Sequence, residues 1–227
     1  MVMSFNTVSE WLSLNSNLLL GATWETVYMV AVAGIVGFAI GIPLGVILHI
    51  TKKGGLLENT KLNGILGAIV NVGRSVPFLV LMVAIIPVTK ILVGTFIGTT
   101  AAIVPLTIGA IPFVARLIEG ALLEVPTGLV EAAQSMGATP VQIITKVLLP
   151  EAMPTIVNSV TITLVTLVSY SAMAGTVGGG GLGDVAIRYG FHRYDVTIMA
   201  VTVVMLIVLV QIIQSIGDAV VRRVDHR

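Results

Sequence analysis

Long apolar stretches alternate with shorter polar ones along the chain, and this pattern predicts five membrane-spanning helices. An α-helix rises ~1.5 Å per residue, so about 20 apolar residues cross a hydrocarbon core ~30 Å thick. The expected spans are residues 25–50, 62–88, 100–118, 154–177 and 196–216. The pattern therefore predicts an all-α membrane protein, with residues 24–217 as its transmembrane domain and residues 218–227 as a short tail.

The first span carries Gly37, Gly41 and Gly45, which recur every fourth residue. Glycines at this spacing form a stripe against which another helix packs closely. Upstream of the span, residues 1–23 carry apolar side chains at roughly helical spacing, which favours a helix lying in the membrane interface. A loosely ordered end with Trp11 as an anchor explains the same residues equally well.

Polar residues interrupt the second span, and they are Asn71, Gly73, Arg74, Ser75 and Pro77. An uncompensated charge within a membrane is costly, so an arginine in the middle of a span indicates a functional position. In the alternative interpretation the span starts near Val76, and Arg74 reaches back to the cytoplasmic interface. The residues leave both interpretations open.

The third span is expected to exit the membrane at Arg116 and Glu119, and residues 119–151 are too polar to sit in lipid. A first helix is expected after Thr127 and should close at Gly137, since glycine adopts the left-handed conformation that ends many helices. Its apolar face would comprise Leu129, Val130, Ala133 and Met136.

A second short helix is expected to follow, with Thr139 as N-cap and Gln142 completing a capping box. Pro150 is expected to end it, and its apolar face would comprise Val141, Ile144 and Leu148. The small residues around the turn would let another surface approach, so the hairpin of about residues 127–150 is predicted to be a docking element. The alternative is an amphipathic loop that only covers its own bundle.

The fourth span is rich in small polar residues, among them Asn158, Ser169 and Ser171. Such residues suit a helix that lines a pathway or packs on a copy of itself. The candidate pathway lining combines the polar residues of the second and fourth spans, and it comprises Asn71, Arg74, Ser75, Asn158, Ser169 and Ser171.

Five spans place the two ends of the chain on opposite sides of the membrane. If the loop that holds Lys52 is cytoplasmic, that side collects eight basic residues and the other side three, as the positive-inside rule requires. The eight are Lys52, Lys53, Lys61, Arg116, Lys146, Arg222, Arg223 and Arg227, and the three are Lys90, Arg188 and Arg193. We therefore expect the N-terminus outside, with the hairpin and the C-terminal tail in the cytoplasm.

Composition supports the membrane assignment and excludes several kinds of chemistry. Hydrophobic residues make up 56% of the chain and charged residues 10%, whereas soluble domains carry about 25% charged residues. There is no cysteine, so disulfides and cysteine metal sites are excluded, and the three histidines form no cluster. The N-terminus lacks a basic region and an A-x-A site, so no removable signal peptide is expected.

Two motifs resemble nucleotide-binding and DNA-binding signatures, but neither is in the structural context that such a site requires. Gly178, Gly180 and Gly183 match G-x-G-x-x-G, but they follow a membrane helix and not a strand, so a close-packed turn at the outer mouth is expected instead of a nucleotide site. The hairpin resembles a DNA-binding helix-turn-helix only in shape. Lys146 is its one cation, which is too few for phosphate contacts, and no nucleic-acid partner is expected.

The sequence carries neither an ATP-hydrolysis motif nor an acidic residue of the kind that couples a carrier to an ion gradient. No P-loop motif G-x-x-x-x-G-K-[ST] is present, so the chain is not expected to hydrolyse ATP. No acidic residue lies deep in a span, which argues against a proton- or sodium-coupled carrier.

The hairpin resembles the EAA loop of ABC importer permeases, with Glu131-Ala132-Ala133, then Gly137, then Val147-Leu148-Leu149-Pro150. The family pattern has isoleucine where this chain has Val147. The stretches RSVPFLVLMVAIIP, AAIVPLTIGAIPFVARLIEGALLEVPTGLVEAAQSMGATP and SYSAMAGTVGGGGLG extend the resemblance to the permease of the methionine importer, a five-span type I member. The resemblance covers about residues 20–220.

This resemblance implies a homodimer in the bacterial inner membrane, with each copy docked on a cytoplasmic ATPase subunit. A periplasmic or lipid-anchored binding protein would deliver the amino acid, and ATP and Mg²⁺ would be used by the ATPase, with no cofactor in this chain. The implied ATPase-coupling residues are Glu131, Ala132, Ala133, Met136, Gly137, Lys146 and Pro150. The expected substrate is methionine, in its L- and D-forms. The alternatives are another small amino acid, an ion-coupled carrier or a non-transporting scaffold.

Overall fold

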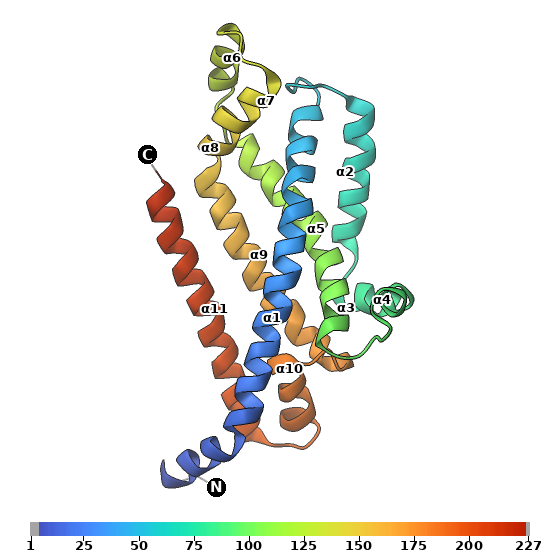
Figure 1. Ribbon diagram of the computed structural model, residues 1–227, viewed down its shortest axis with the longest axis vertical. Helices are drawn as coiled ribbons and strands as arrows, with labels where there is room; N and C mark the ends of the chain where they lie inside the picture. Colours follow the sequence, from blue (N-terminus) through green and yellow to red (C-terminus); the bar gives the residue numbers. More distant parts are fainter. Residues whose placement is uncertain (1–4, 226–227) are drawn as a thin grey trace.

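The computed structural model describes residues 5–225, and all regular structure within that range is helical (Figure 1). The long helices are α1 (Phe5–Thr51), α2 (Thr60–Ser75), α5 (Thr99–Leu123), α9 (Met153–Ala174) and α11 (Val196–Val224). The short helices are α3 (Phe78–Ala84), α4 (Ile86–Val93), α6 (Thr127–Ser135), α7 (Pro140–Ile143), α8 (Leu149–Glu151) and α10 (Gly181–Val185). Two π-helices (Ile144–Leu148 and Ala186–Phe191) and a 3-10 turn (Gly175–Val177) complete the helical segments of this range.

Among the described residues, four segments are long and apolar enough to cross a membrane: Asn15–Thr51, Thr99–Leu123, Met153–Val177 and Val196–Val224. They match the first, third, fourth and fifth predicted spans. The second span differs, because α2 and α3 pass the same test only as a pair and bend by 100° between them. The bundle therefore has five passes only if this bent pair counts as one.

The bend separates α2 from the segment that follows Val76. α3 has seven residues and is by itself far too short to cross a membrane at ~1.5 Å per residue, and α4 follows it after Ile85. α2 packs beside α1 and α5. Arg74 lies at the end of α2 that is remote from the loop joining α1 to α2 (Figure 1).

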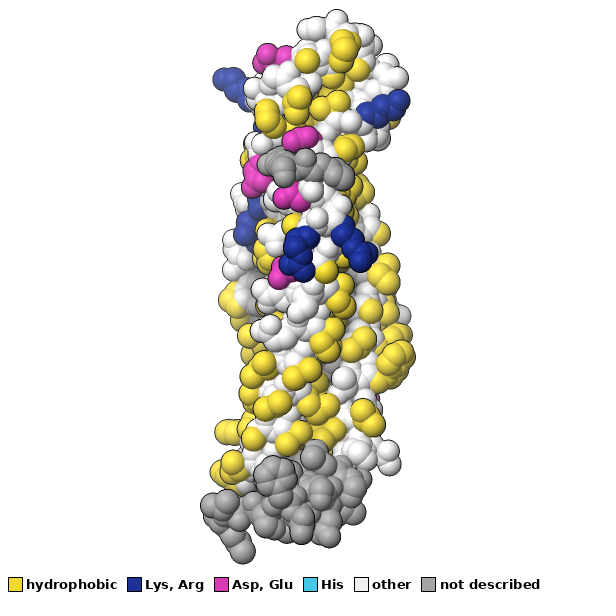
Figure 2. All heavy atoms as spheres, turned by 90° about the vertical axis from the view of Figure 1, so that its left-hand side faces the viewer, with side chains coloured by type: hydrophobic (Ala, Val, Ile, Leu, Met, Phe, Trp, Pro, Cys, Tyr) yellow, Lys and Arg dark blue, Asp and Glu magenta, His cyan; other side chains and the backbone are white. Residues whose placement is uncertain are grey.

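The two ends of the bundle differ in character. The hairpin of α6 and α7 and the loop between α1 and α2 lie at one end, and α10 lies at the other, near the start of α1 (Figure 1). On the face shown in Figure 2, charged side chains gather toward the hairpin end and hydrophobic side chains cover much of the rest. α1 begins at Phe5 and runs unbroken through residues 23 and 24, across the predicted boundary of the transmembrane domain, and residues 1–4 lie outside the described range.

α1 packs on α5 through the predicted glycine stripe. A Cβ atom placed on Gly41 would lie 2.7 Å from the Val114 Cβ, and one on Gly45 would lie 2.6 Å from the Ala115 carbonyl oxygen. The same crowding recurs at Gly37. The predicted close packing is confirmed, and the partner helix is α5.

Replacing Gly41 by leucine should force α1 away from α5 and destabilise the protein by about 1–3 kcal/mol or more, because no space exists for the new side chain. Gly21 provides the matched control in the same helix, since nothing lies within 4 Å of its added Cβ. Gly21→Ala should leave stability unchanged or raise it by up to about 1 kcal/mol. Thermal unfolding of both variants in detergent tests this, and equal midpoints for Gly41→Leu and the parent protein would contradict it.

Candidate functional site

The first half of the hairpin between α5 and α9 forms as the sequence predicts, with a turn at Gly137 and a capping box at the start of α7. After α6 the chain turns at Gly137, whose φ of 80° is left-handed, and the Ala138 N–H donates back to the Ala133 carbonyl at 3.1 Å. α7 then starts with the predicted capping box. The Gln142 N–H donates to the Thr139 hydroxyl at 3.4 Å, and the Thr139 N–H donates to the Gln142 side chain at 2.8 Å.

The second half of the hairpin differs from the prediction. The expectation that Pro150 ends the helix is wrong, because a π-helix follows α7 directly and Pro150 lies in α8, which leads into α9 after Ala152. The wider π-turn shifts which residues face inward. Ile143 and Leu148 are buried, whereas Val141, which was expected on the apolar face, is exposed.

One face of the hairpin packs on its own bundle. Ala133, Ile143 and Leu148 join a core with Ile118 and Leu122 near the end of α5. From α6, Ala133 lies within this cluster and Val130 packs against it, whereas Leu129 and Met136 do not take part. The alternative of a loop that covers its own bundle therefore describes one face only.

The opposite face of the hairpin is free in the single chain. Met136 exposes 82% of its surface, and Leu129 is exposed as well, although both were expected on the apolar face of α6. The remaining residues implied in coupling are also exposed, and they are Glu131, Ala132, Gly137, Lys146 and Pro150. An exposed apolar side chain in a rim of polar ones suits a protein contact.

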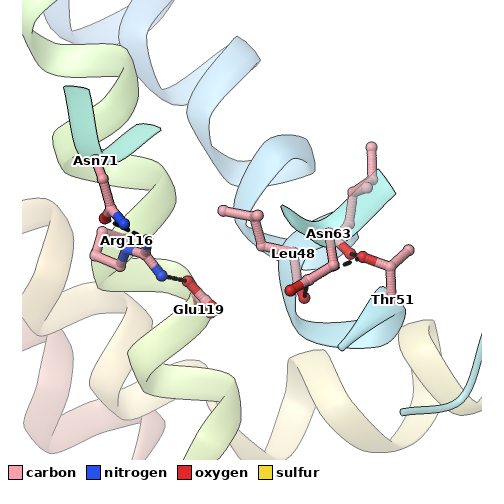
Figure 3. Close-up of polar contacts among 7 residues, drawn as sticks. Leu48, Thr51, Asn63, Asn71, Arg116 and Glu119 are labelled. Atoms are coloured by element: carbon pink, nitrogen blue, oxygen red, sulfur yellow. Dashed lines mark hydrogen bonds and ion pairs between the residues drawn. The ribbon is translucent and has the colours of Figure 1, made fainter. Parts of the chain in front are cut away.

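The polar residues of α2 lie beside α5. The Asn71 side-chain oxygen accepts a hydrogen bond from the Arg116 guanidinium at 2.5 Å, and Arg116 also pairs with Glu119 (Figure 3). A second bond holds the other end of α2, where the Asn63 amide donates to the Leu48 carbonyl at 2.7 Å (Figure 3). Arg116 and Glu119 do not mark the end of the third span, because α5 continues to Leu123.

The other two candidates on α2 differ from Asn71. The Ser75 hydroxyl donates to the Asn71 carbonyl at 2.7 Å, a bond within the helix. The Arg74 guanidinium is exposed in the single chain, and it makes no hydrogen bond or ion pair with any residue in the range 5–225. Arg74 borders a cavity at the α2–α3 bend that also touches Tyr170 of α9.

The candidates on α9 face three different surroundings. Asn158 borders an open polar cleft of about 420 Å³ with Asp218 and Arg222 of α11, and Ser169 borders an apolar groove between α9 and α11. Ser171 is buried and donates to the Val168 carbonyl at 2.7 Å. The structure thus does not gather the six predicted lining residues into one site, and they remain candidates for different levels of a pathway.

Glu25 and Thr26 were missed in the sequence because their partners lie 156 residues away. The Glu25 carboxylate accepts from the Gly181 N–H at 2.7 Å, and the Thr26 hydroxyl accepts from the Leu182 N–H at 2.9 Å. These bonds tie the first residues of α10, where the glycine-rich segment 178–183 ends, to α1. This segment is close-packed, as predicted, since a Cβ on Gly183 would lie 2.4 Å from the backbone of Ala172.

Comparison with known proteins identifies the family of this chain. The family model described as the binding-protein-dependent transport system inner membrane component matches residues 41–226. The chain belongs to this family. It is thus an inner-membrane transport component, and the family predicted from the EAA loop is confirmed.

Several known proteins are similar to this chain along nearly its whole length. A probable D-methionine transport system permease protein of Vibrio cholerae is 87% identical over 225 residues, which is 99% of this chain and 100% of the relative. A protein of the same description from Pasteurella multocida is 50% identical over 206 residues, or 91% and 95% of the two chains. A structure of the MetNI methionine ABC transporter in an inward-facing conformation matches with a TM-score of 0.92 at 52% identity, over 99% of this chain and 100% of that one. The type I importer permease fold is thereby confirmed.

The turn of this permease at Gly137 can be tested against a second glycine of the hairpin. Gly137→Ala should destabilise the turn by about 1–2 kcal/mol, because a Cβ is disfavoured at positive φ although no atom lies within 4 Å of it. Gly128 is equally uncrowded but lies within helical α6, so Gly128→Ala should stabilise it. Amide hydrogen exchange across residues 127–150 should be faster in the first variant and unchanged or slower in the second. Identical exchange in both would contradict the role of the left-handed turn.

Proposed function

We propose that two copies of this chain form the permease of an ATP-driven methionine importer, with an ATPase subunit docked on each hairpin. The observation that carries the proposal is the hairpin's free face, where Met136 stands exposed on a loop with the EAA pattern. The chain has no P-loop motif, so ATP and Mg²⁺ belong to the partner subunit. Methionine is proposed because the relatives at 87% and 50% identity are described as D-methionine permeases and the matching structure is a methionine transporter.

The orientation follows from the ATPase. The hairpin, the α1–α2 loop and the end of α11 would face the cytoplasm, where basic residues are in excess. The N-terminus and α10 would face outward, toward a binding protein that delivers the substrate. The close-packed turn tied to Glu25 would then lie at the outer mouth.

Coupling would use the rigid path from the hairpin to the bundle. The buried cluster around Ala133 and Leu148 attaches the hairpin to α5, and the π-helix with α8 attaches it to α9. When ATP closes the ATPase pair, the two hairpins would move together, and α5 and α9 would move with them. Rocking of the two copies would then expose the pathway alternately to each side.

Reconstitution tests the function. The chain with its ATPase in liposomes, supplied with the binding protein and ATP inside, should take up D- and L-methionine, and uptake should stop when ATP is omitted. Uptake driven by an ion gradient without the ATPase would support the ion-coupled alternative instead. Uptake of a different small amino acid with no uptake of methionine would reject the substrate and leave the coupling mechanism standing.

Met136→Glu should weaken ATPase association and methionine uptake by about tenfold or more, because an exposed apolar anchor is replaced by a charge at the docking face. The thermal stability of the permease should not change, since 82% of the Met136 surface lies outside the fold. Leu57→Glu is the control, as Leu57 is exposed in the α1–α2 loop and not on the hairpin. Equal co-purification of ATPase with both variants would reject Met136 as an anchor.

A further inference from the structure

A cavity of about 170 Å³ lies at the bend between α2 and α3, and it combines one charged wall with several aromatic ones. Its walls include Arg74, Phe78, Leu81, Gly109, Phe113 and Tyr170. These residues come from α2, α3, α5 and α9, so the cavity is formed by the tertiary fold and by no single segment. The cavity lies where α2 ends and the chain bends by 100° into α3, and residues on both sides of the bend line it.

The charged wall of the cavity is formed by the Arg74 side chain. Within residues 5–225, Arg74 forms no ion pair or hydrogen bond, whereas the nearby Arg116 is neutralised by Glu119 and bonded to Asn71. An arginine left without a partner inside a membrane protein is costly, so a partner is expected from outside the chain. The planar fork of a guanidinium matches a carboxylate with two parallel hydrogen bonds.

The backbone next to Arg74 favours a positive group. α2 stops at Ser75, and the chain then bends by 100°, so the last carbonyls of α2 have no following turn of helix to donate to them. The carboxyl end of a helix carries partial negative charge. A guanidinium beside free carbonyls is complementary to a zwitterion, in which a carboxylate and an ammonium group share one carbon atom.

The other walls of the cavity are largely apolar and aromatic. The rings of Phe78 and Tyr170 stack with centroids 4.3 Å apart and planes at 4°. Leu81 and Phe113 extend this wall. Aromatic rings make favourable contacts with a thioether sulfur, and flexible unbranched side chains fit such irregular apolar spaces.

We propose that this cavity is a binding site for the transported amino acid within the permease. The carboxylate would bind Arg74, the ammonium group would face the carbonyl end of α2, and the thioether side chain would lie against Phe113 and Tyr170. The proposal rests on the proposed function, since it takes methionine as the cargo. It adds a recognition step inside the membrane, separate from any selection by the binding protein.

A lipid phosphate is the other partner that Arg74 could take. α2 has 16 residues, so Arg74 lies roughly 20 Å along the helix from the loop at the hairpin end, away from the headgroups on that side. The aromatic stack beside Arg74 also suits a compact apolar side chain better than a lipid headgroup. The cavity therefore favours the amino acid.

Photolabelling with photo-methionine tests the proposed site, because the analogue attaches covalently to the residues next to which it binds. This analogue keeps the carboxylate and the ammonium group and carries a light-activated diazirine in its side chain. The permease–ATPase complex in phosphatidylcholine nanodiscs, illuminated with photo-methionine, should be labelled on peptides that hold Phe113 or Tyr170. Excess methionine should abolish the labelling, and methioninol, which lacks the carboxylate, should not.

Two variants and one control complete the test. Arg74→Gln should reduce labelling at least tenfold, and Arg188→Gln should not, because Arg188 is paired with Asp184 and does not line the cavity. Gly109→Val should reduce labelling without removing a charge, since a Cβ there reaches into the cavity wall 3.6 Å from Leu81 and Phe78. The Gly109 variant keeps the test decisive if Arg74→Gln fails to assemble.

The proposal is overturned if the wild-type complex imports methionine but is not labelled at this cavity, or if labelling there survives both Arg74→Gln and Gly109→Val. It is also overturned if Arg74→Gln leaves labelling intact and lowers thermal stability only in nanodiscs with anionic phosphatidylglycerol, since Arg74 then serves a lipid phosphate. Failure of methionine uptake by the wild-type complex would instead reject the proposed function, so the two failures are distinguishable.

Discussion

Close contact between α1 and α5 is the interaction on which the rest of the structure depends. Lipid provides no hydrophobic force to press two helices together, so they associate through van der Waals contact, which requires a near approach of their backbones. Gly41 and Gly45 permit that approach along the middle of α1. α5 in turn contacts α2, α3, α4 and α9 and carries the hairpin at its end. Its position therefore sets both the place of the hairpin and one wall of the cavity at the α2–α3 bend.

Arg116 and Arg74 differ in how their positive charge is compensated within the chain. Arg116 lies within α5 but is accompanied by Glu119 and Asn71, so its charge is compensated inside the chain. Arg74 has no such partner in the described residues and lies where α2 breaks. In a membrane protein a polar backbone break is tolerated where it faces a cavity or water, and the bend is such a place.

The hairpin combines a firm attachment with a free face. Its inner side chains are held in the same cluster as the end of α5, and the helical path through the π-turn continues to α9. Its outer side keeps Met136 exposed, with no contact that would bury it in the single chain. The proposed coupling to an ATPase needs both features, because a partner would bind the exposed face and the buried face joins that contact to the bundle.

Features that depend on neighbouring residues could be predicted from the sequence. The four unbroken spans, the glycine stripe, the turn at Gly137 and the capping box at Thr139 all follow from patterns within a few residues, because helix propensity, capping and hydrophobic periodicity act locally. The EAA pattern also identified the family without the structure.

Contacts between groups that are distant in the chain could not be predicted from the sequence and are seen only in the folded bundle. The 100° bend after α2, the partner of Arg116, the bond from Glu25 to Gly181 and the stack of Phe78 on Tyr170 join segments remote in the chain. The π-turn after α7 exchanged Val141 for Ile143 on the buried face, although periodicity alone favoured Val141. These outcomes depend on how whole helices pack, and packing is set by the complete bundle instead of by any one segment.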